Sequence, residues 1–215
     1  MAARKLVLIL DFGSQYTQLI ARRVREASVY CEILPHTASL AQVKERGPSA
    51  LILSGGPSSV YDEGAPDLDL GLLELGVPVL GICYGTQILA HRGGGKVARS
   101  EHREYGRAPV RVTDRRGILA RVPEGDLELW MSHGDRIEAA PEGFSLIADN
   151  SSTPFCGIAH HEKRIYGLQF HPEVAHTPEG RAIIDAFLFD VAGLSPDWTP
   201  ASFIEESVAK IREQI

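Results

Sequence analysis

Residues 81–85 place a cysteine where nucleophilic chemistry is expected. Cys83 lies two residues from each of two glycines, Gly81 and Gly85, at the junction between the apolar run 77–80 and the helical stretch 86–90. A Gly-x-nucleophile-x-Gly sequence at such a junction is typical of a nucleophile elbow, whose sharp turn holds the middle side chain above the first helical turn. A helix N-terminus stabilises a thiolate by about 0.3 to 1 kcal/mol, whereas one pKa unit corresponds to about 1.4 kcal/mol. The thiol therefore needs a base as well.

A suitable base lies near the other end of the chain. The apolar strand predicted at residues 165–170 runs directly into His171, Pro172 and Glu173. An imidazole two residues from a carboxylate can be oriented through one ring nitrogen while the other nitrogen faces a thiol. The sequence therefore predicts a catalytic triad of Cys83, His171 and Glu173, and the elbow also places the N–H of Tyr84 to stabilise an oxyanion.

The elements that must position these residues follow a strand, helix, strand rhythm. This rhythm favours parallel pairing with right-handed crossovers, and ligands then bind at the carboxyl ends of the strands. Residues 96–169 change to short β-rich segments separated by turns. We therefore expect an α/β fold: a single domain with a mostly parallel central sheet flanked by helices, plus a smaller β-rich mixed or antiparallel extension. The predicted strands of the first part are 5–10, 29–34, 50–53 and 77–80, with one helix on whose face Tyr16, Leu19, Ile20, Val24 and Ala27 lie and another around 68–75.

The last fifth of the chain returns to a helical pattern. Thr177 is predicted to cap a helix that ends at Gly193. A second helix is predicted to begin at Thr199 and Pro200, with an apolar stripe of Phe203, Ile204, Val208 and Ile211. We expect residues 1–193 to form the main domain and residues 194–215 to form a C-terminal helical segment.

Composition restricts the class of protein. The chain has 215 residues, 44% of them hydrophobic, which is enough for one substantial core. It contains no apolar run long enough for a membrane span and no signal peptide, so we expect a cytoplasmic protein. The net charge of −6 and the lack of a basic cluster argue against a nucleic-acid or membrane partner.

The remaining cysteines and histidines predict no further chemistry. Cys31 and Cys156 lie in apolar stretches and are expected to be inert, reduced core thiols. The histidines form no HxH, HExxH or Cys-His spacing, and we therefore predict no metal site, in spite of His133, His160, His161 and His176.

Several motifs together resemble those of the triad-type, class I glutamine amidotransferases. They are the elbow at 81–85 with Gln87, the turn at 54–57 and the distal residues 171–173. The resemblance implies hydrolysis of glutamine, with a second oxyanion donor from the backbone of Gly55 or Gly56. It also implies that Gln87, Ser132, Gly134 and Asp135 bind glutamine, and that this chain itself needs no cofactor.

Further segments resemble one branch of that family, and the likeness runs from Leu6 to the last residue. These segments are 11–16, 102–106, 130–135 and 196–199. In this branch an ATP-dependent synthetase domain or subunit uses the ammonia to convert XMP to GMP. The resemblance implies such a partner, and residues 194–215 would lead toward it. ATP and magnesium are expected to bind to the partner, because residues 1–215 contain no Gly-rich phosphate loop.

Two other interpretations remain open from the sequence. The chain could be the glutaminase of another amidotransferase, or a γ-glutamyl hydrolase, since these share the elbow and the distal His and Glu. It could also be a non-catalytic glutamine-binding module, against which the complete triad argues. The segments at 11–15 and around Trp198 favour a role in GMP formation over the first of these.

Overall fold

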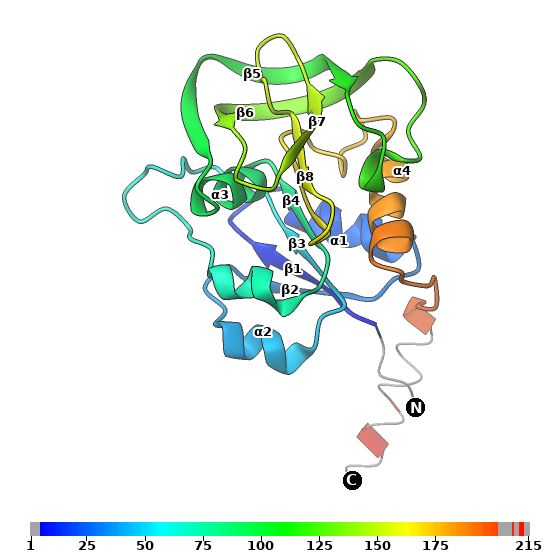
Figure 1. Cartoon of the computed structure of the whole chain (residues 1–215). Coiled ribbons are helices and arrows are strands. Elements are labelled where there is room, and N and C mark those ends of the chain that lie inside the picture. The colour runs from blue at the N-terminus through cyan, green and yellow to red at the C-terminus, as the bar shows by residue number, and fades with distance from the viewer. Residues whose placement is uncertain (1–4, 202–207, 209–210, 213–215) are drawn as a thin grey trace.

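A nine-stranded mixed sheet forms the centre of the fold, in the order β2-β1-β3-β4-β9-β8-β7-β5-β6 (Figure 1). The computed structural model describes residues 5–201, 208 and 211–212, and only the backbone of residues 101–103. Phe203 and Ile204 of the expected C-terminal stripe lie outside the described residues.

The first half of the sheet is parallel, as the strand, helix, strand rhythm predicts. Its strands are β1 (Val7–Asp11), β2 (Cys31–Pro35), β3 (Ala50–Leu53), β4 (Val79–Ile82) and β9 (Ile165–Leu168). The connections carry α1 (Thr17–Glu26), α2 (Leu40–Arg46), the 3-10 helix η1 (Leu70–Leu75) and α3 (Tyr84–Arg92). The helix expected around 68–75 is therefore a shorter 3-10 helix, which the Asp69 side chain caps by accepting from the Gly71 N–H.

The second half of the sheet is antiparallel and continues directly from β9. Its strands are β8 (Gly157–His160), β7 (Ser145–Asp149), β5 (Lys96–Val112) and β6 (Leu127–Ala139), and the 3-10 helix η2 (Gly117–Leu119) lies between β5 and β6 in the chain. The predicted extension is confirmed, and it belongs to the same sheet as the parallel strands.

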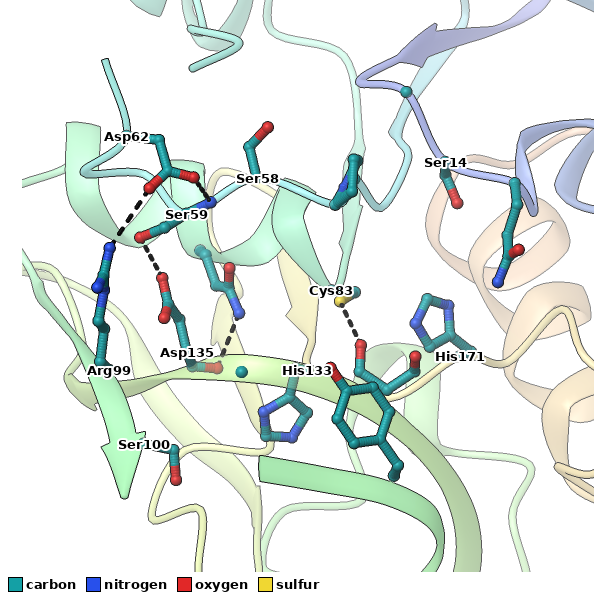
Figure 2. Close-up of a pocket in the computed structure, with 18 residues that line it drawn as sticks. Ser14, Ser58, Ser59, Asp62, Cys83, Arg99, Ser100, His133, Asp135 and His171 are labelled. Atoms are coloured by element: carbon teal, nitrogen blue, oxygen red, sulfur yellow. Dashed lines mark hydrogen bonds and ion pairs between the residues drawn. The ribbon is translucent and has the colours of Figure 1, made fainter. Parts of the chain in front are cut away.

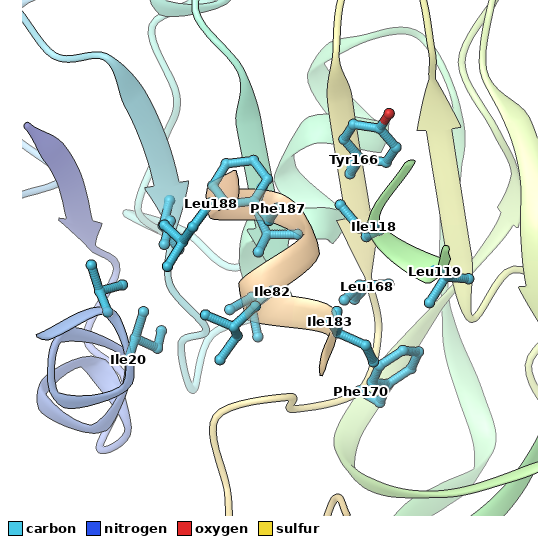
Figure 3. Close-up of a cluster of buried hydrophobic side chains, with 14 of the residues drawn as sticks. Ile20, Ile82, Ile118, Leu119, Tyr166, Leu168, Phe170, Ile183, Phe187 and Leu188 are labelled. Carbon is cyan, nitrogen blue, oxygen red and sulfur yellow. The ribbon is translucent and has the colours of Figure 1, made fainter. Parts of the chain in front are cut away.

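Alternating side chains of the sheet supply two large hydrophobic cores, one on each face, and a smaller cluster includes Val97, Ile137 and Ile158. In β1, Val7 and Ile9 belong to one core and Leu8 and Leu10 to the other, and all four are at most 1% exposed. The first core packs against α1, α4 (Gly180–Asp185) and its π-helical continuation η3 (Ala186–Val191), as Figure 3 shows for Ile20, Ile183 and Phe187. The second core packs against α2, η1 and α3.

The prediction that Thr177 caps the C-terminal helix is wrong. The N-cap position of α4 is Glu179, without a side-chain hydrogen bond, and the Thr177 hydroxyl instead accepts from the N–H of Trp130 at 3.1 Å. Because Thr177 is buried against β6, its hydroxyl makes that contact, and the helix starts two residues later than predicted. Beyond the helix, Trp198 is 7% exposed, and its backbone N–H donates to Ser28 O at 2.9 Å. This hydrogen bond holds the chain at Trp198 against the turn that follows α1.

Candidate active site

The elbow at Cys83 has the strained backbone that the glycine spacing predicts. Cys83 has a φ of 52° and occupies the N-cap position of α3, directly after β4. This conformation is rare for a residue with a side chain and costs on the order of 1 to 3 kcal/mol. A Cβ atom on Gly85 would overlap the carbonyl of Leu53, and one on Gly81 would lie 2.7 Å from Leu89 Cδ1. Both glycines are therefore required for α3 to pack closely on β3 and β4.

His171 and Glu173 form a tightly paired, buried couple just beyond the end of β9. Nδ1 of His171 lies 2.8 Å from Oε1 of Glu173, and the two residues are 3% and 0% exposed. The Tyr16 ring meets the imidazole edge-on, with 5.2 Å between the ring centroids. The carboxylate thus fixes one ring nitrogen and leaves the other available to a neighbour.

The imidazole of His171 and the side chain of Cys83 both lie close to Gly55. A Cβ placed on Gly55 would lie 3.4 Å from His171 Cε1 and 3.5 Å from Cys83 Cβ. The thiol itself donates to the carbonyl of Ser132 at 3.5 Å, and Figure 2 shows this contact with the His171 ring nearby. The interactions of the Cys83 side chain therefore include both the Ser132 carbonyl and the His171 imidazole.

Neighbouring groups favour the charged form of His171. Burial lowers the pKa of this imidazole, but its interactions with Cys83 and with the Glu173 carboxylate outweigh burial and raise the pKa well above its usual value. An imidazolium in this position stabilises a thiolate on Cys83.

Three backbone amides beside the thiol have no acceptor among the described residues. The amides of Gly85, Thr86 and Gln87 donate to Ser54 O and Cys83 O. Those of Gly55, Gly56 and Tyr84, the predicted oxyanion donors, donate to none of the residues that the structure describes. Gly56 packs tightly against the backbone of Phe12, where a Cβ would lie 2.6 Å from Phe12 O. This close approach explains why position 56 is glycine.

A cavity of about 620 Å³ opens at this edge of the sheet (Figure 2). This volume suits a small organic ligand. Its walls come from the loops after β1, β3, β4 and β9 and from the middle of β5 and β6. It gathers most of the predicted site residues: Gly56, Cys83, Gln87, Ser132, Gly134, Asp135 and His171. Gly55, Tyr84 and Glu173 lie behind this lining.

Two predicted glutamine-binding side chains already make contacts within the protein. Gln87 is 3% exposed, and its Nε2 donates to Asp135 O at 2.9 Å and to Gln169 Oε1 at 3.3 Å. The Asp135 carboxylate accepts from the Ser59 hydroxyl at 2.5 Å. These contacts hold one carboxylate at the wall of the cavity.

Residues 132–135 lie within a strand and not after one. The apolar pattern predicts a strand that ends at Met131, whereas β6 continues to Ala139. The strand continues because β5 pairs with it along its length, with a break in register beside Gly134. The backbone of these four residues therefore lines the cavity from within a strand.

Several cavity residues are absent from the predicted site. Ser14 and Gln15 follow the carboxyl end of β1, a position that itself indicates ligand contact. Ser59, Asp62 and Arg99 carry no local signal, because a loop and an antiparallel strand far apart in sequence bring them together. Asp62 meets Arg99 at 3.4 Å across the cavity mouth.

Among the residues whose side chains the structure describes, 5–100, 104–201, 208 and 211–212, no group of three His, Cys, Asp or Glu side chains is arranged to hold a metal ion. Within the same described ranges, no helix is long and apolar enough to cross a membrane.

The three cysteines are expected to differ sharply in reactivity. Burial raises the pKa of Cys31 to about 11 and also raises that of Cys156, whereas Cys83 lines the cavity. A chloroketone analogue of glutamine should therefore label Cys83 alone in the native protein. Peptide mass spectrometry measures this, with Cys83→Ala as the unlabelled control. Equal labelling of the three thiols would contradict the assignment of the nucleophile.

Comparison with known proteins agrees with this geometry. The family model described as glutamine amidotransferase class-I matches residues 8–191. The chain is 50% identical to a glutamine-hydrolyzing GMP synthase of Natranaerobius thermophilus, over 99% of this chain and 41% of that protein. It is 55% identical to the protein of the same name from Maridesulfovibrio salexigens, over 97% of this chain and 41% of that one. The chain thus spans about two fifths of the length of these relatives.

Solved structures share the fold. A crystal structure from Thermoplasma acidophilum, described provisionally as one subunit of a GMP synthase, superposes with a TM-score of 0.76 at 30% identity, covering 96% of this chain and 99% of that one. A glutamine amidotransferase structure from Thermotoga maritima gives a TM-score of 0.65 at 22% identity, covering 90% and 87% of the two chains, and shows the fold alone. The matched family model covers the elbow, the paired His171 and Glu173 and the cavity between them. This chain therefore belongs to the class-I glutamine amidotransferase family.

Proposed function

We propose that this chain hydrolyses the side-chain amide of glutamine to glutamate and ammonia through a thioester on Cys83. The observation that carries the proposal is the strained thiol at the N-terminus of α3, in the same cavity as an imidazole whose far nitrogen is held by a buried carboxylate. Such an arrangement suits attack on an amide carbon followed by protonation of an amine.

The proposed reaction begins when the Cys83 side chain leaves the Ser132 carbonyl and gives its proton to His171. The thiolate attacks the amide carbon, and the negative charge moves to the amide oxygen. The N–H groups of Tyr84 and of Gly55 or Gly56 would donate to this oxyanion. As the carbon–nitrogen bond breaks, His171 returns the proton to the departing ammonia.

The second half of the reaction regenerates the thiol. His171 removes a proton from a water molecule, whose oxygen attacks the thioester carbon. The carbon–sulfur bond breaks, glutamate leaves, and the proton returns to Cys83. Throughout, Glu173 holds the ring through Nδ1 and stabilises its charged form.

Charge in the cavity supports an amino acid as the substrate. Asp135 and Asp62 both line it, and Arg99, the one Arg or Lys among the lining residues, already faces Asp62. A carboxylate at Asp135 would attract the α-ammonium group, with backbone groups of Ser132 and Gly134 close by. Gln87 supports this wall through the carbonyl of Asp135.

We also propose that the ammonia is used by an ATP-dependent synthetase domain or subunit that aminates XMP to GMP, in the cytoplasm. The names and greater length of the relatives support this partner. ATP and magnesium would bind to the partner, and this chain would need no cofactor of its own. Residues 194–215 would lead toward the partner.

Addition of the partner is expected to raise glutamine turnover at least about tenfold, or roughly 1.4 kcal/mol of barrier. The reason is the resting contact of the thiol with Ser132, which a shift at the site would have to release. Steady-state glutamate release is measured with the chain alone and with a synthetase domain loaded with XMP and ATP. A chain that is fully active alone and indifferent to that partner would instead favour a γ-glutamyl hydrolase.

A further inference from the structure

The ladder between β5 and β6 opens beside the proposed active site. Arg99 pairs with Asp135 and Glu104 pairs with His133, so residues 100–103 of β5 stand opposite Gly134 alone. A bulge of this kind removes a residue from the regular pairing and re-aims its backbone. On β6 the residue that is left out of the pairing is Gly134, which lines the cavity.

One side of this opening is closed by a buried carboxylate and a buried imidazole. Nε2 of His133 lies 3.1 Å from Oε2 of Glu104, and the two side chains are 1% and 14% exposed. The contact is outside hydrogen-bond geometry, and neither ring nitrogen of His133 has a hydrogen-bond partner among the described residues. The contact of the His133 imidazole with Glu104 is therefore an electrostatic one with the carboxylate.

Three polar side chains from the segment after β7 hold Glu104 in place. Thr153 donates to it at 2.7 Å, Asn150 donates at 3.2 Å, and the Ser152 hydroxyl makes a further short contact. Although burial raises the pKa of Glu104, the contacts with His133, Ser152 and Thr153 lower it to about 2. A fully ionised, multiply bonded carboxylate is a rigid anchor for whatever faces it.

The residues beside His133 are those that meet the thiol and the cavity. Ser132 O accepts from Cys83, and Gly134 follows His133 directly in β6. We propose that the Glu104–His133 pair positions this part of β6, so that the Gly134 backbone is presented to glutamine at the point where the ladder opens. Both are positioning residues, and the inference rests on the proposed glutaminase activity.

The test measures glutamine binding and thiol reactivity separately. Glu104→Gln removes the charge but keeps the shape, and His133→Leu fills the ring's volume without removing a hydrogen bond. Each is expected to raise the KM for glutamine about tenfold with a much smaller change in kcat, because substrate positioning is lost. Alkylation of Cys83 by iodoacetamide, which does not use Gly134, should stay within about twofold of the unmodified chain.

The matched control is Glu128→Gln, the same change at an exposed position near the start of β6. It should leave both readouts unchanged. A folded His133→Leu variant with unaltered KM would overturn the proposal, as would a loss of thiol alkylation in step with kcat/KM. Failure of the unmodified chain to release any glutamate, with or without the partner, would refute the proposed function instead.

Discussion

Replacing Cys83 by alanine is expected to reduce glutamine hydrolysis at least about 10⁴-fold, because removing a covalent nucleophile leaves only binding and oxyanion stabilisation. The substitution also removes the thiol contact with Ser132 but keeps the Cβ and the elbow. Glutamate release measures the loss. Circular dichroism should show that the fold is retained.

A second measurement separates the nucleophile from the partner's chemistry. In an enzyme that joins this chain to the proposed synthetase domain, Cys83→Ala should still form GMP from added ammonia but not from glutamine. The matched control is Cys156→Ala, a thiol that is 0% exposed and outside the cavity. Retention of glutamine-dependent synthesis in Cys83→Ala would contradict the proposed thioester.

Replacing His171 by alanine is expected to lower kcat by about 10² to 10⁴-fold, which is the usual contribution of a positioned acid or base. Glu173→Gln should lower it less, because the amide can still accept from, or donate to, the ring at the 2.8 Å position. Steady-state kinetics at saturating glutamine measure both. If Glu173→Gln proves as inactive as His171→Ala, the carboxylate does more than orient the ring.

The same pair predicts a pH effect with a definite sign. Glu173 helps to raise the pKa of His171, so Glu173→Gln should lower that pKa and move the alkaline limb of the kcat/KM profile to lower pH. In the folded protein the raised pKa contributes stability below the unfolded value of about 6.5, and this contribution disappears as the pH rises through the folded value. An alkaline limb at the same pH in both proteins would contradict this account.

The sequence predicts the parallel half of the fold well because its signals are local. The apolar run at residues 50–53 has the bounds of β3, and the glycines around Cys83 require the turn observed there. The spacing of the predicted triad is also visible in the sequence, since Cys83 directly follows β4 and His171 lies three residues beyond β9. The pattern at 68–75 predicts a longer helix than the 3-10 helix at 70–75, because apolar spacing alone does not distinguish the two.

The rest of the site depends on pairing between distant residues. The length of β6 and the opening beside Gly134 are set by its register with β5. Glu104 and His133 are 29 positions apart in the sequence, and although both lie in segments of the family resemblance, nothing local in the sequence indicates that their side chains meet. Likewise Thr177 is a residue type that often caps helices, but in the fold its hydroxyl accepts a hydrogen bond from the backbone N–H of Trp130 instead.

The adjacency of β4 and β9 also determines when during synthesis a chain of this kind can become active. Ile82, beside the nucleophile, pairs with Leu168, and the entire antiparallel half of the sheet is inserted between them in the sequence. Closing so long a loop is entropically costly, and contacts of this range form slowly. A ribosome must therefore release residues beyond 173 before the thiol meets its imidazole. A nascent chain that stops earlier carries a cysteine without its proposed base, and under the proposed mechanism it would not hydrolyse glutamine.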